Sequence, residues 1–131
     1  MTLLWVVGMI NAFNFVDSMD GLALGLASVA TGFFMLVTVD AAQPTLAALS
    51  AAILGAAIGL FFFNASPARL FLGDSGAQLL GFVLAAIGIA YVPAGAGLPQ
   101  GVSWFVPILL LGVPIFDSTL VVVSRLRRGR P

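Results

Sequence analysis

The stretch FNASPARLFLGDSG, residues 63–76, separates two long apolar runs of this 131-residue chain. Asn64 and Pro67 end the first run, because a proline lacks the N–H that the next helical hydrogen bond would need. The small residues of GDSG, 73–76, form a turn from which a second helix can begin. The stretch therefore predicts two apolar helices joined by a polar loop.

The same loop carries two charges of opposite sign, Arg69 and Asp74. Backbone N–H groups at a helix N-terminus attract anions, an arginine can clamp anionic oxygens, and a carboxylate can hold Mg²⁺. The loop therefore suits a phosphate or a metal ion. An equally simple interpretation is a connector in which Asp74 or Ser75 caps the following helix, since Asp and Ser are common N-caps.

The composition of the chain is that of a membrane protein. Of its residues 61% are hydrophobic and 8% are charged, whereas about a quarter of the residues in a soluble domain are charged. We therefore predict an all-α fold, a polytopic transmembrane helical bundle that forms a single membrane domain over residues 1–131. The chain contains no cysteine and no histidine, which excludes disulfides, thiolate or imidazole catalysis and zinc sites built on those residues within it.

Four apolar runs are long enough to span a bilayer, and a shorter run precedes them. The predicted full spans are residues 22–39, 45–63, 77–92 and 102–124, and the partial N-terminal helix is residues 1–10. Pro44 favours a helix start, and the short connector before it predicts an antiparallel hairpin of the first two spans. Pro107 and Pro114 interrupt the fourth span and predict a kink about a turn before Asp117. The loop 93–101 is uncharged and rich in glycine and proline, as expected of an extracytoplasmic turn.

The arginines predict the orientation of the bundle. Four of the five lie in the C-terminal segment RLRRGRP, residues 125–131, which the positive-inside rule assigns to the cytoplasm. Because each span reverses the direction of the chain, the loop with Arg69 and Asp74 and the polar segment 11–21 fall on the same side. The opposite side carries only Asp40. We therefore expect an inner-membrane protein whose polar loops and C-terminus are cytoplasmic.

The polar segment reads NAFNFVDSMDG. Its polar side chains recur every three residues, as Asn11, Asn14, Asp17 and Asp20. In a helix such neighbours lie about 60° apart, so Asn14 and Asp17 share a face. Together with Asp74 they offer hard oxygen ligands for Mg²⁺, which usually takes one or two carboxylates together with substrate phosphates. The alternative is that these side chains cap and bridge helix ends.

Asp117 differs from the other carboxylates in its depth. It lies roughly 12 Å before Arg125 along a helix that rises about 1.5 Å per residue. An ionisable group inside a membrane segment is a candidate for function, so Asp117 is a candidate residue of undefined role. The alternative is structural, with its carboxylate accepting hydrogen bonds from Ser118, Thr119 or a neighbouring helix.

Three motifs, in this order along the chain, resemble one enzyme family. They are NAFNFVDSMDGLA at residues 11–23, FNASPARLFLGDSGAQLLGF at 63–82 and PIFDSTLVVVSRLRRGRP at 114–131. They are similar to the polyprenyl-phosphate N-acetylhexosamine-1-phosphate transferases, membrane glycosyltransferase family 4. That family includes the undecaprenyl-phosphate N-acetylglucosaminyl-1-phosphate and phospho-N-acetylmuramoyl-pentapeptide transferase types, and the resemblance covers nearly the whole chain.

The resemblance implies a reaction at the cytoplasmic face of the membrane. A polyprenyl phosphate attacks the β-phosphorus of a UDP-N-acetylhexosamine, with Mg²⁺ or Mn²⁺ as cofactor, and UMP leaves. The product would serve cell-envelope glycan synthesis, such as peptidoglycan or lipopolysaccharide. The implied site residues are Asp17 and Asp74 as catalytic groups, Asn11, Asp20 and Arg69 as substrate-binding groups, and Asn14 with Asp74 as metal ligands. The implied partners are the two substrates and membrane lipid, and nucleic acid is not among them. Whether the protein forms a homodimer is left open.

The chain departs from the family pattern in several places. It lacks the family's paired aspartates on an earlier loop and its His-rich or Arg-rich loop after the last matched segment, and Ser18 replaces a more common glycine. We therefore expect the chain to correspond to the C-terminal half of a larger transferase and to be inactive by itself. The alternative class is a non-catalytic structural subunit or a transporter fragment, for which a broken helix with an intramembrane Asp117 would also be suitable.

Overall fold

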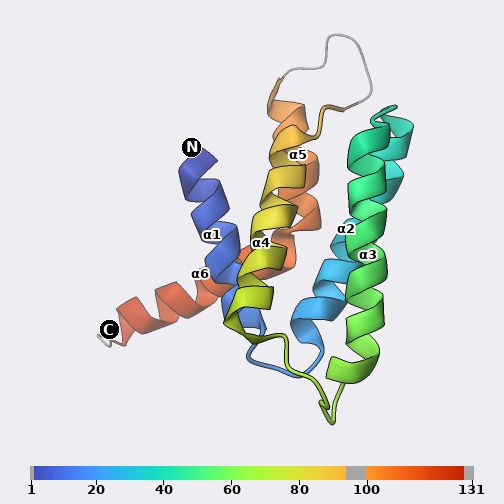
Figure 1. Cartoon of the computed structure of the whole chain (residues 1–131). Coiled ribbons are helices and arrows are strands. Elements are labelled where there is room, and N and C mark those ends of the chain that lie inside the picture. The colour runs from blue at the N-terminus through green and yellow to red at the C-terminus, as the bar shows by residue number, and fades with distance from the viewer. Residues whose placement is uncertain (1, 94–99, 129–131) are drawn as a thin grey trace.

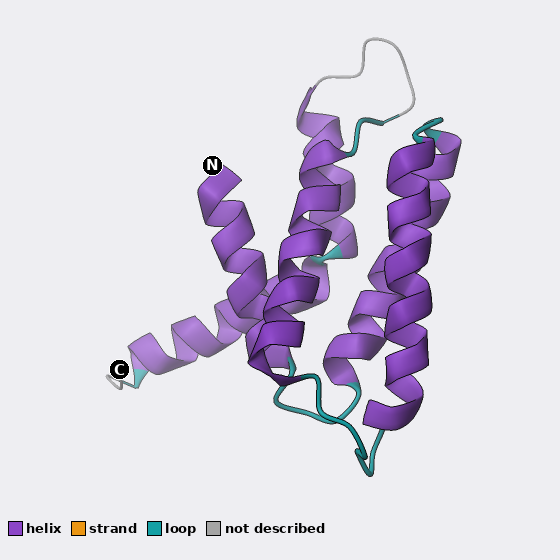
Figure 2. Ribbon diagram, viewed as in Figure 1, coloured by secondary structure: helices purple, strands orange, loops and turns teal. Residues whose placement is uncertain are grey.

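The computed structural model of the chain describes residues 2–93 and 100–128, which form six α-helices and no strand (Figure 2). The helices are α1 (Thr2–Val16), α2 (Leu22–Asp40), α3 (Pro44–Asn64), α4 (Gly73–Ala90), α5 (Gln100–Leu110) and α6 (Gly112–Arg127). The all-α prediction is therefore confirmed for the described part of the chain. Residues 94–99 of the predicted loop 93–101, and Arg130, lie outside the described residues.

The first four helices pack as two antiparallel pairs, α2 with α3 and α1 with α4 (Figure 1). α3 begins with Pro44, whose missing N–H is not needed in a first helical turn. The predicted hairpin of the first two spans is therefore confirmed. α2 also contacts α4, and the two pairs share a buried apolar core that includes Phe13, Leu24, Phe34 and Leu84.

α1 and α4 approach each other closely at Gly81. A Cβ atom at this position would lie 2.5 Å from the Met9 carbonyl oxygen and 2.8 Å from the Ile10 Cα. Only a residue without a side chain permits this approach, because both neighbours are backbone atoms. The antiparallel pairing places the C-terminal end of α1, which precedes Asp17, beside the N-terminal end of α4, which carries Asp74.

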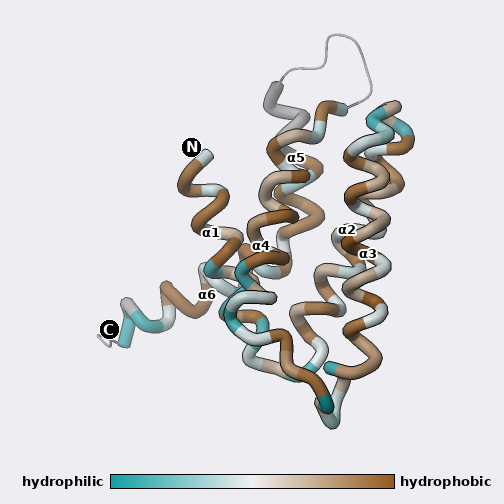
Figure 3. The backbone as a smooth tube through the Cα atoms, in the orientation of Figure 1, coloured by the Kyte–Doolittle hydropathy of each residue, from teal (hydrophilic) through white to brown (hydrophobic). Residues whose placement is uncertain are grey.

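The outer surface of the helices is apolar. Among the described residues, α2, α3 and α4 are long and apolar enough to cross a membrane, and α1 is a shorter apolar helix. Large side chains such as Phe62 (76% exposed) and Leu36 (60%) face outward, where a water-soluble domain would place polar groups. Figure 3 shows hydrophobic colour along most of the helices, and hydrophilic colour at the connection between α2 and α3, toward the opposite end of the bundle and near the C-terminus. The predicted membrane bundle is therefore confirmed.

The predicted fourth span, residues 102–124 with interruptions at Pro107 and Pro114, consists of two helices. The residues of this span form α5 and α6, which are 11 and 16 residues long and are separated at Leu111. Pro114 has no N–H to donate to the Leu110 carbonyl, and Gly112 weakens the helix at the same point. α6 turns away from α5 and leaves the bundle beside α1 (Figure 1). The kink predicted before Asp117 is thus confirmed, and it is a break in the helix.

Candidate functional site

Two polar loops lie at the same end of the bundle. The turn of residues 17–21 joins α1 to α2, and the loop of residues 65–72 joins α3 to α4. Both lie at the lower end of the molecule in Figure 1, opposite the connection between α2 and α3. The prediction that these loops share one side of the bundle is confirmed, and the side of the membrane that they face stays a prediction.

Asp17 and Asp74 are the carboxylates that this arrangement brings together. Asp17 follows α1, and its backbone N–H donates to the Phe13 carbonyl at 3.0 Å. Burial raises the pKa of Asp17, and the negative charge of Asp74 raises this pKa further. The packing of α1 against α4 places both carboxylates at the same end of the bundle, and a cation bound by both would offset their negative charges.

Asp74 lies in the first turn of α4, which begins at Gly73 rather than at the predicted residue 77. Gly73 has a φ of 69°, a conformation that favours glycine. The residue at the N-cap position is Leu72, which makes no side-chain capping hydrogen bond. The interpretation of Asp74 or Ser75 as a helix cap is therefore wrong. The carboxylate of Asp74 is exposed at the positive end of the helix dipole.

Hydrogen bonds through Asp20 and Asn64 join the two loops. The exposed Asp20 carboxylate accepts a hydrogen bond from the Ala68 N–H at 3.3 Å. The amide of Asn64, which is 3% exposed, accepts from the Gly21 N–H at 2.9 Å and donates to the Leu70 carbonyl at 2.8 Å. The turn and the loop are therefore connected by one exposed contact and one buried residue.

Asn64 is a residue of this site whose role sequence reasoning missed. The sequence predicts only that Asn64 ends a helix, and α3 does end there. The signal that could have revealed its second role is a single amide at the junction of an apolar run and a polar loop. An amide buried at such a junction must bond on both sides, because an unpaired buried polar group is costly.

The amide and guanidinium side chains of the predicted site differ in how they are engaged. Asn14 is half-buried on α1, and in the described part of the chain its side chain makes no hydrogen bond. Asn11 is exposed and donates to the Val7 carbonyl of its own helix at 2.8 Å. Arg69 is exposed, while its backbone N–H donates to the Phe63 carbonyl at 2.8 Å. The side chains of Asn14 and Arg69 are therefore available to a ligand, whereas that of Asn11 is tied to α1.

The donor atoms at this end of the bundle fit a magnesium ion that is shared with a substrate. No three acidic, histidine or cysteine side chains among the described residues are grouped as a metal site made of protein alone would require. Asp17 and Asp74 offer two carboxylates and Asn14 an amide oxygen, while Mg²⁺ usually takes one or two carboxylates together with substrate phosphates. Mg²⁺ or Mn²⁺ held jointly by the protein and a phosphorylated substrate is compatible with this set.

Asp117 lies on α6, and its side chain is exposed. The hydroxyls of Ser118 and Thr119 donate to backbone carbonyls in the preceding turn of their own helix, at 2.8 and 2.7 Å. The interpretation in which these hydroxyls donate to Asp117 is therefore wrong. The structure gives Asp117 no place among the residues that the two loops bring together.

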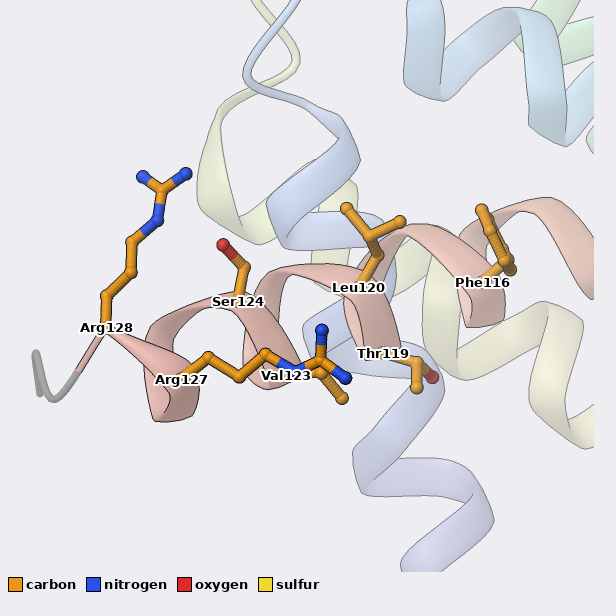
Figure 4. A pocket seen from close by; sticks show the side chains of 7 residues that line it. All are labelled: Phe116, Thr119, Leu120, Val123, Ser124, Arg127 and Arg128. Carbon is orange, nitrogen blue, oxygen red and sulfur yellow. The ribbon is translucent and has the colours of Figure 1, made fainter.

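An open cavity of about 470 Å³ lies along one face of α6, and the residues that line it belong to α6 or directly follow it (Figure 4). Its walls combine apolar, hydroxyl and cationic side chains, from Phe116, Thr119, Leu120, Val123, Ser124, Arg127 and Arg128. In Figure 4 the Arg127 side chain extends back along the helix toward Val123, and that of Arg128 projects away from it. Cationic and apolar walls of this kind suit a lipid that carries a phosphate.

The fold and the loops define a polytopic helical membrane protein with paired carboxylates at one end of its bundle. Comparison with known families then gives a family. The model of glycosyl transferase family 4 matches residues 1–92, and the chain belongs to this family. The predicted family is thereby confirmed, and the first two of the three motifs, residues 11–23 and 63–82, lie within the matched range.

Individual relatives agree with this assignment. A probable undecaprenyl-phosphate N-acetylglucosaminyl 1-phosphate transferase of Bacillus subtilis is 33% identical over 134 residues, which cover 100% of this chain and 36% of the relative. The phospho-N-acetylmuramoyl-pentapeptide-transferase of Levilactobacillus brevis is 42% identical over 87 residues, 66% of this chain and 27% of the relative. The phospho-N-acetylmuramoyl-pentapeptide-transferase of Bacillus cytotoxicus is 39% identical over 89 residues, which cover 68% of this chain and 28% of the relative. The matched part of the chain thus spans 27–36% of the length of these curated relatives.

Proposed function

We propose that the two loops form part of the site of a membrane transferase that moves a sugar-1-phosphate from a UDP-N-acetylhexosamine to a polyprenyl phosphate. The observation that carries this proposal is that the packing of α1 against α4 places Asp17 and Asp74 at one end of an apolar helical bundle. Support for the substrate class comes from the names of the relatives, which include an undecaprenyl-phosphate N-acetylglucosaminyl 1-phosphate transferase.

In the proposed reaction an oxygen of the lipid phosphate attacks the β-phosphorus of the UDP-sugar. The bond from that phosphorus to the bridging oxygen breaks, UMP leaves with the electron pair, and a polyprenyl diphosphate sugar remains. Bound Mg²⁺ or Mn²⁺ would neutralise charge on the diphosphate and make UMP a better leaving group. The protein has to supply position and electrostatic stabilisation, which account for most of phosphoryl-transfer catalysis.

The residues of the two loops and of the adjoining helix ends divide these tasks. Asp74 and Asn14 would hold the cation, and Asp17, which the charge of Asp74 already affects, would lie beside the diphosphate. Asp20 is fixed to the neighbouring loop and exposed, so it can accept a hydrogen bond from the nucleoside base. The exposed guanidinium of Arg69 can contact phosphate oxygens.

The lipid substrate has to reach these loops from the bilayer. The apolar outer surface of the helices permits such an approach, and the cavity along α6 adds two guanidinium groups, Arg127 and Arg128. Because clustered arginines mark the cytoplasmic side, we place the loops and the C-terminus there, in the inner membrane. The reaction would then be the first membrane step of cell-envelope glycan synthesis.

The transporter alternative has less support. Substrate sites of transporters lie near the bilayer midplane, at broken helices. Here Asp17 directly follows α1 and Asp74 lies in the first turn of α4, at the end of the bundle where the two loops lie.

Substitution of Asp74 in the full-length gene product tests the proposal. Asp74→Asn keeps the shape of the side chain but replaces a charged oxygen ligand with a weak neutral one. We expect UMP release from UDP-N-acetylglucosamine and undecaprenyl phosphate to fall at least about 100-fold, and the Mg²⁺ requirement to rise. Asp40→Asn, at the opposite end of the bundle, is the matched control. Equal turnover in the two variants, with the same Mg²⁺ requirement, would contradict the proposal.

A further inference from the structure

Asn64 is a buried polar side chain that contacts both loops of the proposed site. We propose that Asn64 is a positioning residue, whose amide holds the turn of residues 17–21 and the loop of residues 65–72 at a fixed separation, so that Asp17 and Asp74 face the same ligand. This inference rests on the proposed function and adds a residue that need not touch the substrate.

Both ends of the Asn64 amide are engaged. The Oδ1 atom accepts from the Gly21 N–H at 2.9 Å, and the Nδ2 atom donates to the Leu70 carbonyl at 2.8 Å. A side-chain amide has an acceptor at one end and a donor at the other, so it can pair an N–H of one loop with a C=O of another. The side chain is 3% exposed, and water therefore competes little for the Gly21 bond.

The partners of Asn64 adjoin residues of the proposed site. Gly21 follows Asp20 in the turn, and Leu70 follows Arg69 in the loop. The exposed hydrogen bond from the loop backbone to the Asp20 carboxylate, at 3.3 Å, is the second connection between these segments. Because that bond is longer and open to water, the Asn64 amide is the stronger of the two connections.

Two variants separate the functions of the amide. Asn64→Asp keeps an acceptor for the Gly21 N–H but places an oxygen against the Leu70 carbonyl, so that two acceptors face each other. Asn64→Leu has a similar size and removes both hydrogen bonds. Ser50→Ala is the matched control, because Ser50 is buried on the same helix and its hydroxyl has no hydrogen-bond partner among the described residues.

Hydrogen exchange of the chain in lipid nanodiscs, without metal or substrate, tests the connection itself. In Asn64→Leu we expect exchange of the Gly21 amide and of the amides in residues 65–72 to become at least about tenfold faster. Ser50→Ala should leave these amides as protected as in the wild-type chain. Wild-type protection of Gly21 in Asn64→Leu would overturn the inference.

Turnover of the full-length gene product tests the consequence of the connection. In both Asn64 variants kcat should fall about 10- to 100-fold, as is typical when a residue that orients a ligand-holding group is lost, while KM for the UDP-sugar changes little. Asn64→Asp retains one hydrogen bond, so it allows the comparison even if Asn64→Leu does not fold.

The remaining outcomes are distinguishable. A raised KM with unchanged kcat would overturn the inference, because it would assign Asn64 to direct substrate contact. Unchanged kcat and KM in an Asn64 variant with faster loop exchange would also overturn it. If the wild-type protein releases no UMP, the proposed function fails, and the connection between the loops is then judged by exchange alone.

Discussion

Replacing Gly81 by alanine tests whether the contact between α1 and α4 sets the geometry of the acidic site. The added Cβ would lie 2.5 Å from the Met9 carbonyl oxygen and 2.8 Å from the Ile10 Cα. These are backbone atoms, which cannot rotate away, and ordinary van der Waals contact begins at 3.4 Å. The helices must therefore separate locally by about 0.9 Å, the difference between 3.4 and 2.5 Å.

This displacement matters because both helices lead into the site. Gly81 lies about two helical turns after Asp74, and Met9 lies about two turns before Asp17. Overpacking of this kind costs about 1–3 kcal/mol of stability. A misplacement of about 1 Å in a catalytic group can lower turnover about 100-fold. We therefore expect Gly81→Ala to fold with a lower Tm and to lose about two orders of magnitude in UMP release.

Gly59→Ala is the matched control for this substitution. Gly59 lies in α3, and a Cβ added there meets no described atom within 4 Å. The control therefore reports the gain in helix propensity alone, about 1 kcal/mol. Both variants of the full-length gene product are compared by thermal unfolding and by UMP release in the same membranes. If Gly81→Ala keeps the Tm and the turnover of Gly59→Ala, the reasoning about the contact is refuted.

Three further substitutions test local features. Gly21→Ala forces an L side chain into a φ of 77° with the Phe61 ring 3.2 Å from its Cβ, and should lower stability by about 1–2 kcal/mol. Because the pKa of Asp17 is raised, the folded state binds a proton more readily than the unfolded chain does. The Tm of the metal-free protein should therefore rise as the pH falls through that pKa, and Asp17→Asn should flatten this pH dependence. Gln43→Ala removes hydrogen bonds of 2.8 and 3.5 Å to the Val92 backbone and should cost about 0.5–1.5 kcal/mol, with UMP release unchanged. A wild-type Tm in Gly21→Ala or in Gln43→Ala would contradict the reasoning about that position. A wild-type pH dependence of Tm in Asp17→Asn would contradict the raised pKa.

The spanning helices could be predicted from the sequence because their signals are local. The predicted spans 22–39 and 45–63 match α2 and α3 to within one residue at each end, since Pro44 and the apolar runs mark these boundaries. The grouping of Asp17 and Asp74 at one end follows from the alternating direction of the spans. α4 begins earlier than predicted because the small residues after Leu72 fit a first helical turn as well as they fit a loop.

The features that depend on distant partners could not be predicted. Asn64 looks like a helix stop until its partner Gly21, 43 residues away, is known. Gly81 looks like one small residue among many until α1 is placed against it. Pro114 predicts a kink, but the path of α6 after the break depends on its packing against α1. The role of each of these residues depends on tertiary packing, which local sequence propensity does not predict.

Mn²⁺ binding measured by electron paramagnetic resonance tests most directly whether Asp17 and Asp74 form one cation site. The chain in lipid nanodiscs is titrated with Mn²⁺ in the presence of UDP-N-acetylglucosamine, and Asp17→Asn, Asp74→Asn and Asp40→Asn are compared with the wild type. We expect one bound ion per chain, binding at least about tenfold weaker in Asp17→Asn and in Asp74→Asn, and wild-type binding in Asp40→Asn. The same Mn²⁺ affinity in all three variants would contradict a site shared by the two carboxylates.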